Sequence, residues 1–286
     1  MRKILTLLVL ATFIFGAKAQ DLDNSLLWKI SGKDLEKPSY LFGTIHMICP
    51  DDMVMKDYFE STLTETEQLV LELDMDEPSL MMDMQKYGVN EGMKNISSEM
   101  TEKEQKIVNE WFQKNYMAGL QQLGIMKPFL LTAMVIPKYM DCPQPQAYEA
   151  VFMQMAQKDS IDILGLETVE QQFAAVDKIP RQKQIEMLIE SITDSIKSKE
   201  EFNKLVSAYQ NQDLNTMYEI GKENPQYADM EGSLLIERNT SWVDPMQALM
   251  KQKPTFFAVG ALHLSGDDGI INLLRKEGYT VEAVTQ

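Results

Sequence analysis

The chain contains only two histidines, and each closes a Gly-x-x-His tetrad. His46 lies in "YLFGTIHMICPDD" (40–52), and His263 lies near the other end of the chain in "FFAVGALHLSGDD" (256–268). A histidine at a strand end is usually a structural hydrogen-bonding residue, but the repeated setting favours a shared function. Parallel strands bring equivalent loops to one edge of a sheet, so we expect both imidazoles to line one cleft.

Strand-like segments gather near both ends of the chain. They are short, apolar and bounded by Gly, Pro or acidic residues, and they are LLWKIS (26–31), SYLFGTI (39–45), QLVLELD (68–74), FFAVGAL (256–262) and TVEAV (280–284). We therefore predict an α/β (α+β) fold whose central mixed sheet is built from duplicated strand-GxxH-helix-strand halves.

The middle of the chain favours helices, and we predict a helix-rich insert over roughly residues 80–250. Thr101 and Glu104 have the spacing of a capping box. One helical face is predicted from the spacing of Ile185, Leu188, Ile189, Ile192 and Ile196. The strand-like IDILGLET (161–168) interrupts the insert.

The first residues have the features of an export signal. Arg2 and Lys3 precede an apolar run over 4–15, and Ala17-Lys18-Ala19 is a small-x-small cleavage pattern. The apolar run is shorter than the roughly 20 residues that cross a bilayer as a helix. We predict a leader over 1–19, one domain over 20–286, and an exported protein, periplasmic or secreted, with no membrane span after cleavage.

Charge and cysteine content narrow the partners further. The net charge of −16 argues against nucleic acid or anionic lipid as a partner. Cys49 and Cys142 are the only cysteines. A disulfide, two free thiols and a metal-ligand role for Cys49 are all open from the sequence, and a disulfide would tether the loop that carries His46.

Glu72, in "LVLELD", is an acid inside an apolar run. A buried carboxylate is costly unless it is paired, protonated or bound to a metal, although this residue could also turn outward at a strand end. Beside His46 and His263 it would complete a two-histidine, one-carboxylate set, which suits zinc, manganese or iron.

Other polar residues carry weaker signals. Glu167 is predicted at the carboxyl end of a strand, where open α/β sheets gather functional groups. Both Glu167 and Arg238 also fit solvent-facing positions on amphipathic elements. The aspartate pairs at 51–52 and 267–268 are better explained as helix N-terminal acids than as metal ligands.

Five motifs in order, "YLFGTIHM", "LVLELD", "LGLETVEQQ", "IERNTSW" and "FFAVGALHL", resemble the TraB/GumN family, which includes the Tiki metalloproteases. The likeness runs from about Leu26 to Val284. It implies a sheet-based α/β fold with inverted or duplicated halves, related to erythromycin-esterase and ChaN-like proteins. It also implies a site made of His46, His263, Glu72, Glu167 and Arg238, with Gly43 and Gly260 shaping the loops.

Tiki proteins are described as metal-dependent proteases that favour manganese or cobalt. The first hypothesis is therefore an exported metal-dependent hydrolase, a peptidase, that uses Mn, Co or Zn on a peptide or small-molecule substrate. Here His46, His263 and a glutamate hold the ion, Glu72 or Glu167 is the general base, and Arg238 steadies a carboxylate or oxyanion. The alternative is a metal- or haem-binding protein without catalysis. Oligomeric state is not indicated by the sequence.

Overall fold

The computed structural model describes residues 22–224 and 230–285, so the predicted leader over 1–19 lies outside the described residues. The strands are β1 Leu27–Ser31, β2 Ser39–Thr44, β3 Gln68–Leu73, β4 Asp162–Glu167, β5 Thr255–Gly260 and β6 Thr280–Ala283. The α-helices are α1 Asp57–Thr64, α2 Leu80–Tyr87, α3 Glu102–Tyr116, α4 Leu120–Leu123, α5 Pro128–Val135, α6 Tyr148–Lys158, α7 Val169–Asp177, α8 Arg181–Thr193, α9 Ser195–Gln210, α10 Leu214–Glu223, α12 Glu237–Gln252 and α13 Ile270–Lys276. The 3-10 turns are η1 Pro50–Asp52, η2 Glu91–Met93, η3 Ile96–Glu99, η4 Ile136–Lys138 and η6 Ala261–His263, and η5 Gly232–Ile236 is a π-helix.

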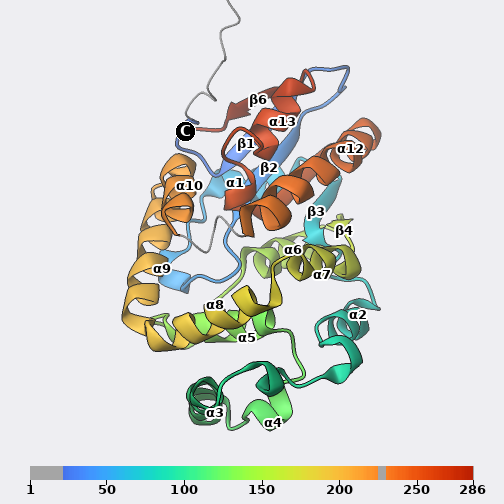
Figure 1. The fold of residues 1–286 in the computed structure, drawn as a ribbon. Helices are drawn as coiled ribbons and strands as arrows, with labels where there is room; N and C mark the ends of the chain where they lie inside the picture. The colour runs from blue at the N-terminus through green and yellow to red at the C-terminus, as the bar shows by residue number, and fades with distance from the viewer. Residues whose placement is uncertain (1–21, 225–229, 286) are drawn as a thin grey trace, which may run out of the picture.

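All six predicted strands form one mixed sheet in the order β4-β3-β5-β2-β1-β6, which confirms the α/β class (Figure 1). Strands β4, β3, β5 and β2 are parallel, whereas β1 is antiparallel to both of its neighbours. Strand β5 lies between β3, which carries Glu72, and β2, which leads to the first tetrad. Strand β5 is apolar on both faces, so a central place with neighbours on each side buries it best.

The two ends of the chain share an element order but not a full geometry. Each has a strand, a Gly-x-x-His tetrad, a helix and a further strand, namely β2-α1-β3 and β5-α13-β6. The connection from β2 to β3 crosses one strand of the sheet, β5, whereas the connection from β5 to β6 crosses two, β2 and β1. The important result is that β2 and β5, which precede the two histidines, are parallel neighbours.

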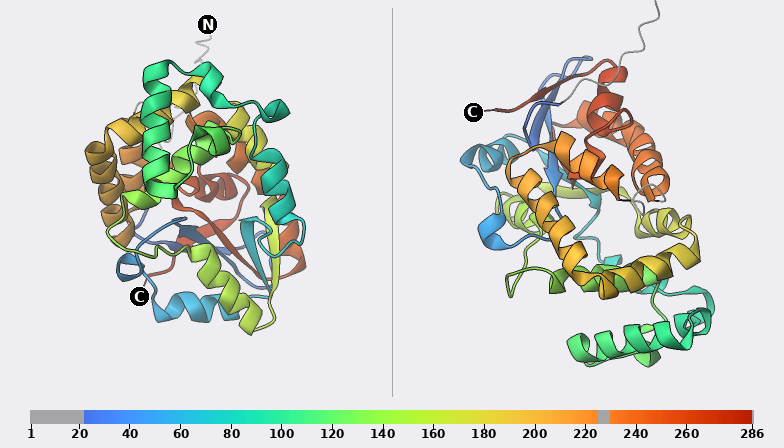
Figure 2. Two further views of the ribbon diagram at one scale, coloured as in Figure 1. Left: turned by 90° about the horizontal axis from the view of Figure 1, so that it is seen from below. Right: turned by 60° about the vertical axis from the view of Figure 1, so that its left-hand side comes forward.

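Helices cover both faces of the sheet. Figure 2 shows α12 and α13 on one side and α1 on the other, where α6 packs with it. Fully buried aromatic side chains fill the core, and the Phe42 ring contacts those of Phe59, Phe152 and Phe256. The sheet therefore holds its strand ends rigidly.

A second apolar core lies in the helical region beyond the carboxyl ends of the parallel strands (Figure 1). The capping box of Thr101 and Glu104 opens α3 as predicted. The predicted helical face is confirmed only in part. Ile185 and Leu188 are buried, but the helix breaks at Asp194, so Ile196 falls in α9 and is 78% exposed. Strand β4, inside this helical stretch of sequence, joins the edge of the sheet.

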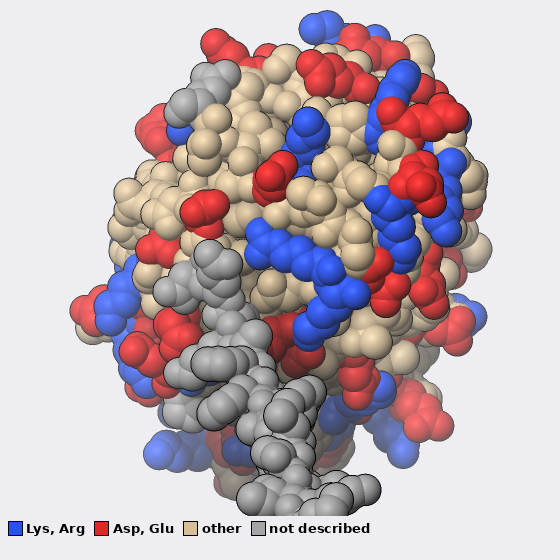
Figure 3. Space-filling model, turned by 90° about the horizontal axis from the view of Figure 1, so that it is seen from above, with Lys and Arg blue, Asp and Glu red and all other residues tan. Residues whose placement is uncertain are grey.

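The described residues contain no helix that is both long and apolar enough to cross a bilayer. On the face seen from above, Lys and Arg side chains lie among Asp and Glu side chains (Figure 3).

Candidate functional site

Four predicted residues meet at the carboxyl ends of neighbouring parallel strands. Glu167 ends β4 and Glu72 lies one residue before the end of β3. His263 lies in η6 directly after β5, and His46 follows β2. Because β4, β3, β5 and β2 are adjacent, the sheet edge collects side chains that are far apart in sequence.

Both imidazoles face the same carboxylate oxygen. His263 Nε2 lies 3.8 Å and His46 Nε2 lies 4.0 Å from Oε1 of Glu72. Glu72 is only 6% exposed, so it points inward rather than to solvent. Its Oε1 also accepts a hydrogen bond from the Gly260 N–H at 2.8 Å. The two tetrads and the strand acid therefore form one cluster.

Arg238 of α12 reaches into this cluster and joins its two acids. Its Nη2 donates at 2.6 Å to Oε2 of Glu72 and at 2.6 Å to Oε1 of Glu167. Trp242 Nε1 and Gln172 Nε2 donate to the two oxygens of Glu167. Glu167 and Arg238 are thus buried partners and not solvent-facing residues, with side chains 5% and 11% exposed.

Asn239 fixes the orientation of the His263 ring. Its Nδ2 donates to two backbone carbonyls, so its Oδ1 faces His263 Nδ1 at 2.6 Å. This network assigns the proton to Nδ1 and leaves the Nε2 lone pair directed into the cluster, where Arg238 Nη1 lies 3.1 Å away.

Glu149 of α6 fixes the orientation of the His46 ring in the same way. Its Oε1 lies 2.9 Å from His46 Nδ1 and accepts a hydrogen bond from the Thr44 hydroxyl. Its other oxygen is buried and has no hydrogen-bond partner among the described residues. A carboxylate on Nδ1 turns Nε2 of His46 toward Glu72, and carboxylates orient many metal-bound histidines through the same contact.

The two histidines have opposite pKa shifts. Burial lowers the pKa of His263 to about 3, so its imidazole is neutral at pH 7. Desolvation also lowers the pKa of His46, but the hydrogen bond to Glu149 and the nearby carboxylates outweigh it and raise that pKa to about 9. One imidazole is therefore a lone-pair donor, and the other carries a proton when no ligand is bound.

The pKa values of the two acids, Glu72 and Glu167, also shift in opposite directions. Burial raises the pKa of Glu72, but the imidazoles and Arg238 outweigh it and hold this pKa well below its usual range. Burial dominates at Glu167 and raises its pKa despite the contact with Arg238. Glu72 is accordingly the firmly ionised acid of the cluster.

Replacing Glu149 with glutamine should lower the pKa of His46, because a neutral amide removes the negative charge that stabilises the imidazolium. The chain has two histidines, so NMR titration of the ring C–H signals resolves both, with His46→Asn providing the assignment. The His263 signal is the internal control and should not move.

The raised pKa of His46 also makes the stability of the fold depend on pH. The stabilisation is complete below the ordinary pKa of about 6.5, and it is lost as the pH rises toward 9. Because the His46 side chain is 65% exposed, the effect on stability should be small.

Glycine suits position 43 and position 260 because a side chain there would crowd neighbouring atoms. Neither Gly43 nor Gly260 has a positive φ, so these positions do not need glycine for a left-handed backbone conformation. A Cβ on Gly43 would lie 3.1 Å from Cα of Ala261, where the two motifs pack together. A Cβ on Gly260 would lie 3.3 Å from Oε1 of Glu72 and 3.8 Å from His46 Nε2, within the cluster itself.

The donor set suits a divalent ion, but its spacing is wider than a bound ion requires. Metal–nitrogen bonds near 2.0 Å put tetrahedral ligand atoms about 3.3 Å apart, and here Nε2 and Oε1 are 3.8–4.0 Å apart. Within residues 22–224 and 230–285, no three His, Cys, Asp or Glu side chains form a ready-made metal group. Ion binding would draw the donors inward by a few tenths of an ångström and would displace Arg238 Nη1 from His263.

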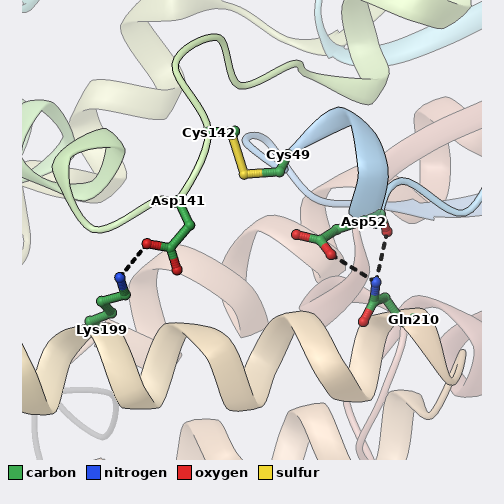
Figure 4. Close-up of a disulfide and its surroundings, with 6 residues drawn as sticks. All are labelled: Cys49, Asp52, Asp141, Cys142, Lys199 and Gln210. Atoms are coloured by element: carbon green, nitrogen blue, oxygen red, sulfur yellow. Dashed lines mark hydrogen bonds and ion pairs between the residues drawn. A yellow bond between two sulfur atoms is a disulfide. The ribbon is translucent and has the colours of Figure 1, made fainter.

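A disulfide joins the loops that support the His46 pair. Cys49 is bonded to Cys142, which settles the alternatives left open by the sequence (Figure 4). Backbone hydrogen bonds between Ile48 and Gln146 close the same contact. Helix α9 braces both loops, since Lys199 pairs with Asp141 and Gln210 donates to Asp52. The bond thus connects the segment after His46 to the segment leading into Glu149.

Replacing both cysteines with serine should cost about 2–4 kcal/mol of unfolding free energy, as is typical for a long closed loop. Denaturant unfolding measures this loss, and reduced wild-type protein should match the double variant. The His46 pKa should also move toward its ordinary value, because the loops would no longer hold Glu149 against the ring. An unchanged pKa would show that α9 alone positions the pair.

Some expectations were incomplete. Asp51 and Asp52 form a 3-10 turn, and the helix that follows begins only at Asp57. Asp267 and Asp268 precede α13 at the surface.

Glu149 was not predicted as a site residue, because a single acid in an amphipathic helix carries no local signal. Asn239 was noticed only as a neighbour of Arg238, and Trp242 was not singled out, although both lie within "IERNTSW".

The sequence model of the TraB/PrgY/gumN family matches residues 26–283. No curated protein and no solved structure matches the chain. The match covers both tetrads, all six strands and every residue of the cluster at the sheet edge. The chain therefore belongs to the TraB/PrgY/gumN family.

Proposed function

We propose that this protein is an exported metal-dependent hydrolase that cleaves peptides, with His46, His263 and Glu72 holding one divalent ion of manganese, cobalt or zinc. The observation that carries the proposal is the convergence of both Nε2 atoms on Glu72 Oε1. Asn239 and Glu149 support it, because each orients one imidazole through Nδ1.

A bound divalent ion would supply Lewis acidity and a water of lowered pKa. The residues themselves supply the rest. Glu72 Oε1 faces the space between the imidazoles and can ligate or accept the proton of a water there. Arg238 holds Glu72 and can donate Nη1 to a developing oxyanion once His263 no longer occupies it.

Glu167 receives a different role from the one that the sequence suggested. Both of its oxygens accept hydrogen bonds, from Arg238, Trp242 and Gln172. A general base needs a free oxygen at the reacting water, so we assign Glu167 to positioning Arg238. Export remains part of the proposal and rests on the leader pattern, together with the disulfide that an oxidising compartment favours.

The haem-binding alternative is less well supported by this geometry. Two histidines that ligate haem approach the iron from opposite faces of a flat macrocycle. Here both approach one oxygen of a buried, hydrogen-bonded glutamate. A small ion would require only an inward shift of the donors and would leave Glu72 in place, whereas a macrocycle would have to displace Glu72.

The test is cleavage of a broad peptide library by the purified protein with Mn²⁺, Co²⁺ or Zn²⁺, followed by mass spectrometry. We expect products that disappear with chelator and in His46→Asn. Asp52→Asn, in the same loop but outside the cluster, should retain activity. If no metal-dependent cleavage is removed by His46→Asn, the hydrolase proposal fails and a non-catalytic binding protein takes its place.

A further inference from the structure

An apolar pocket lies beside the candidate site and has no role in the proposed chemistry. Its volume is about 300 Å³, and its walls include Phe129, Ala133, Met187, Leu234, Leu235 and Leu262. This is near the lower end of ligand-pocket sizes, about 300–1,000 Å³. The pocket therefore has room for a large apolar side chain.

The pocket adjoins the cluster through two of its own walls. Leu262 directly precedes His263 in η6. The Leu234 carbonyl accepts a 2.9 Å hydrogen bond from Arg238 Nη1, the same nitrogen that faces His263. A group held in the pocket would thus be attached close to the imidazole and guanidinium that face the reacting atoms.

The backbone segment that forms part of the pocket wall is a π-helical turn. Leu234 and Leu235 lie in the π-helix η5, which leads straight into α12 and Arg238. Single π turns inside helices are rare and concentrate at functional sites. Here the π turn lets one short segment supply the pocket walls and the Arg238 contact together.

The polar residues in the wall direct their polar groups elsewhere. Thr132 Oγ1 donates to the Pro128 carbonyl of its own helix. Glu231 Oε1 accepts a hydrogen bond from the Tyr218 hydroxyl at 2.9 Å. These engaged groups offer little to a polar ligand, so the chemistry of the pocket selects an apolar one.

A larger cavity of about 440 Å³ lies next to the pocket and shares the wall residues Thr132, Ile136 and Met187 with it. Charged residues surround that second cavity, including Lys183, Glu186, Asp194 and Lys197. An apolar pocket beside a larger cavity with charged and apolar walls suits an extended polypeptide, which carries a polar backbone and several side chains, better than it suits a small apolar molecule.

We propose that this pocket is the specificity site of the enzyme, and that it binds a leucine, methionine or phenylalanine side chain of the peptide next to the cleaved bond. This inference rests on the proposed peptidase function. Burial of one such side chain should favour these residues over serine by about 10- to 100-fold in kcat/KM.

The first test measures binding without turnover. Met187 and Met230 line the pocket, so their ¹³C-labelled methyl groups report on it by NMR after assignment with Met→Leu variants. N-acetyl-leucine methylamide should shift both signals, and N-acetyl-serine methylamide should not. Ala133→Phe, which fills the pocket, should remove the response. Leu235→Gln, which adds an amide without filling it, should weaken binding about 10-fold or more.

Ala248→Phe is the matched control, because it makes the same change at an exposed position of α12. Equal shifts with the serine probe, or an unchanged response in folded Ala133→Phe or Leu235→Gln, would overturn the proposal. If peptides are cleaved without preference for an apolar residue, the pocket proposal fails while the hydrolase remains. If nothing is cleaved but the leucine probe binds in the pocket, the hydrolase fails and the apolar site remains.

Discussion

Replacing His46 with asparagine should weaken divalent metal binding by more than about 100-fold and leave the fold intact. Asparagine places an amide nitrogen near the position of Nδ1, so the hydrogen bond to Glu149 is kept while Nε2 is deleted. Loss of a residue that only hydrogen-bonds to a metal-bound histidine typically costs about 10- to 100-fold in metal affinity, so loss of the ligand itself should cost more. The His46 side chain is 65% exposed, so the change in unfolding free energy should stay within about 0.5 kcal/mol.

Titration calorimetry with Mn²⁺, Co²⁺ and Zn²⁺ measures this effect, and wild-type protein should bind one ion. His263→Asn should have the same consequence, because it keeps the contact with Asn239 and removes the other Nε2. Asp52→Asn is the control and should bind normally. Full metal occupancy in either histidine variant would refute a shared site.

Replacing Arg238 with methionine should destabilise the protein by about 3–5 kcal/mol at pH 7, because the buried carboxylates of Glu72 and Glu167 would lose the cation that pairs with both. Their side chains are 8% and 5% exposed, so water cannot compensate. Without Arg238 the pKa of Glu72 should rise, and the pKa of Glu167, which burial already raises, should rise further. The folded variant would then bind more protons than the folded wild-type protein, so the loss of stability should grow as the pH rises.

Denaturant unfolding at pH 5 and pH 7 in the presence of chelator tests this prediction, and the loss should be smaller at pH 5. Lys253→Met removes an exposed ion pair with Asp162, at the other end of β4, and should cost at most about 1 kcal/mol. Adding Glu72→Gln and Glu167→Gln to Arg238→Met should restore much of the loss. A destabilisation below 1 kcal/mol, or one that does not depend on pH, would mean that the acids are not held as charges by Arg238.

The strands and the identity of the site residues were accessible from the sequence because both leave local patterns. Fully buried strands such as β2 and β5 are apolar on both faces, so they stand out as short runs between Gly, Pro and acids. Glu72 was noticeable because an acid within such a run needs a partner. The repeated tetrad then linked His46 to His263 without any spatial information.

The remaining parts carried no local pattern. Glu149 is the only acid of a helix whose two glutamines face solvent, and only the packing of α6 against the sheet brings it to His46. Ile196 continues a helical spacing, but the chain turns at Asp194 and exposes it. Periodicity predicts which side of an element is apolar, and it does not predict where the element ends or what covers it.

The sequence alone determined that two histidines and an acid stand at strand ends, because burial and turn chemistry are encoded by neighbouring residues. Only the tertiary structure decided that β5 separates β2 from β3, that Arg238 joins Glu72 to Glu167, and that an apolar pocket opens beside them. Strand order and helix docking minimise the free energy of the whole core, to which residues far apart in the chain contribute together. The site is therefore visible as parts in the sequence and becomes one cluster only through packing.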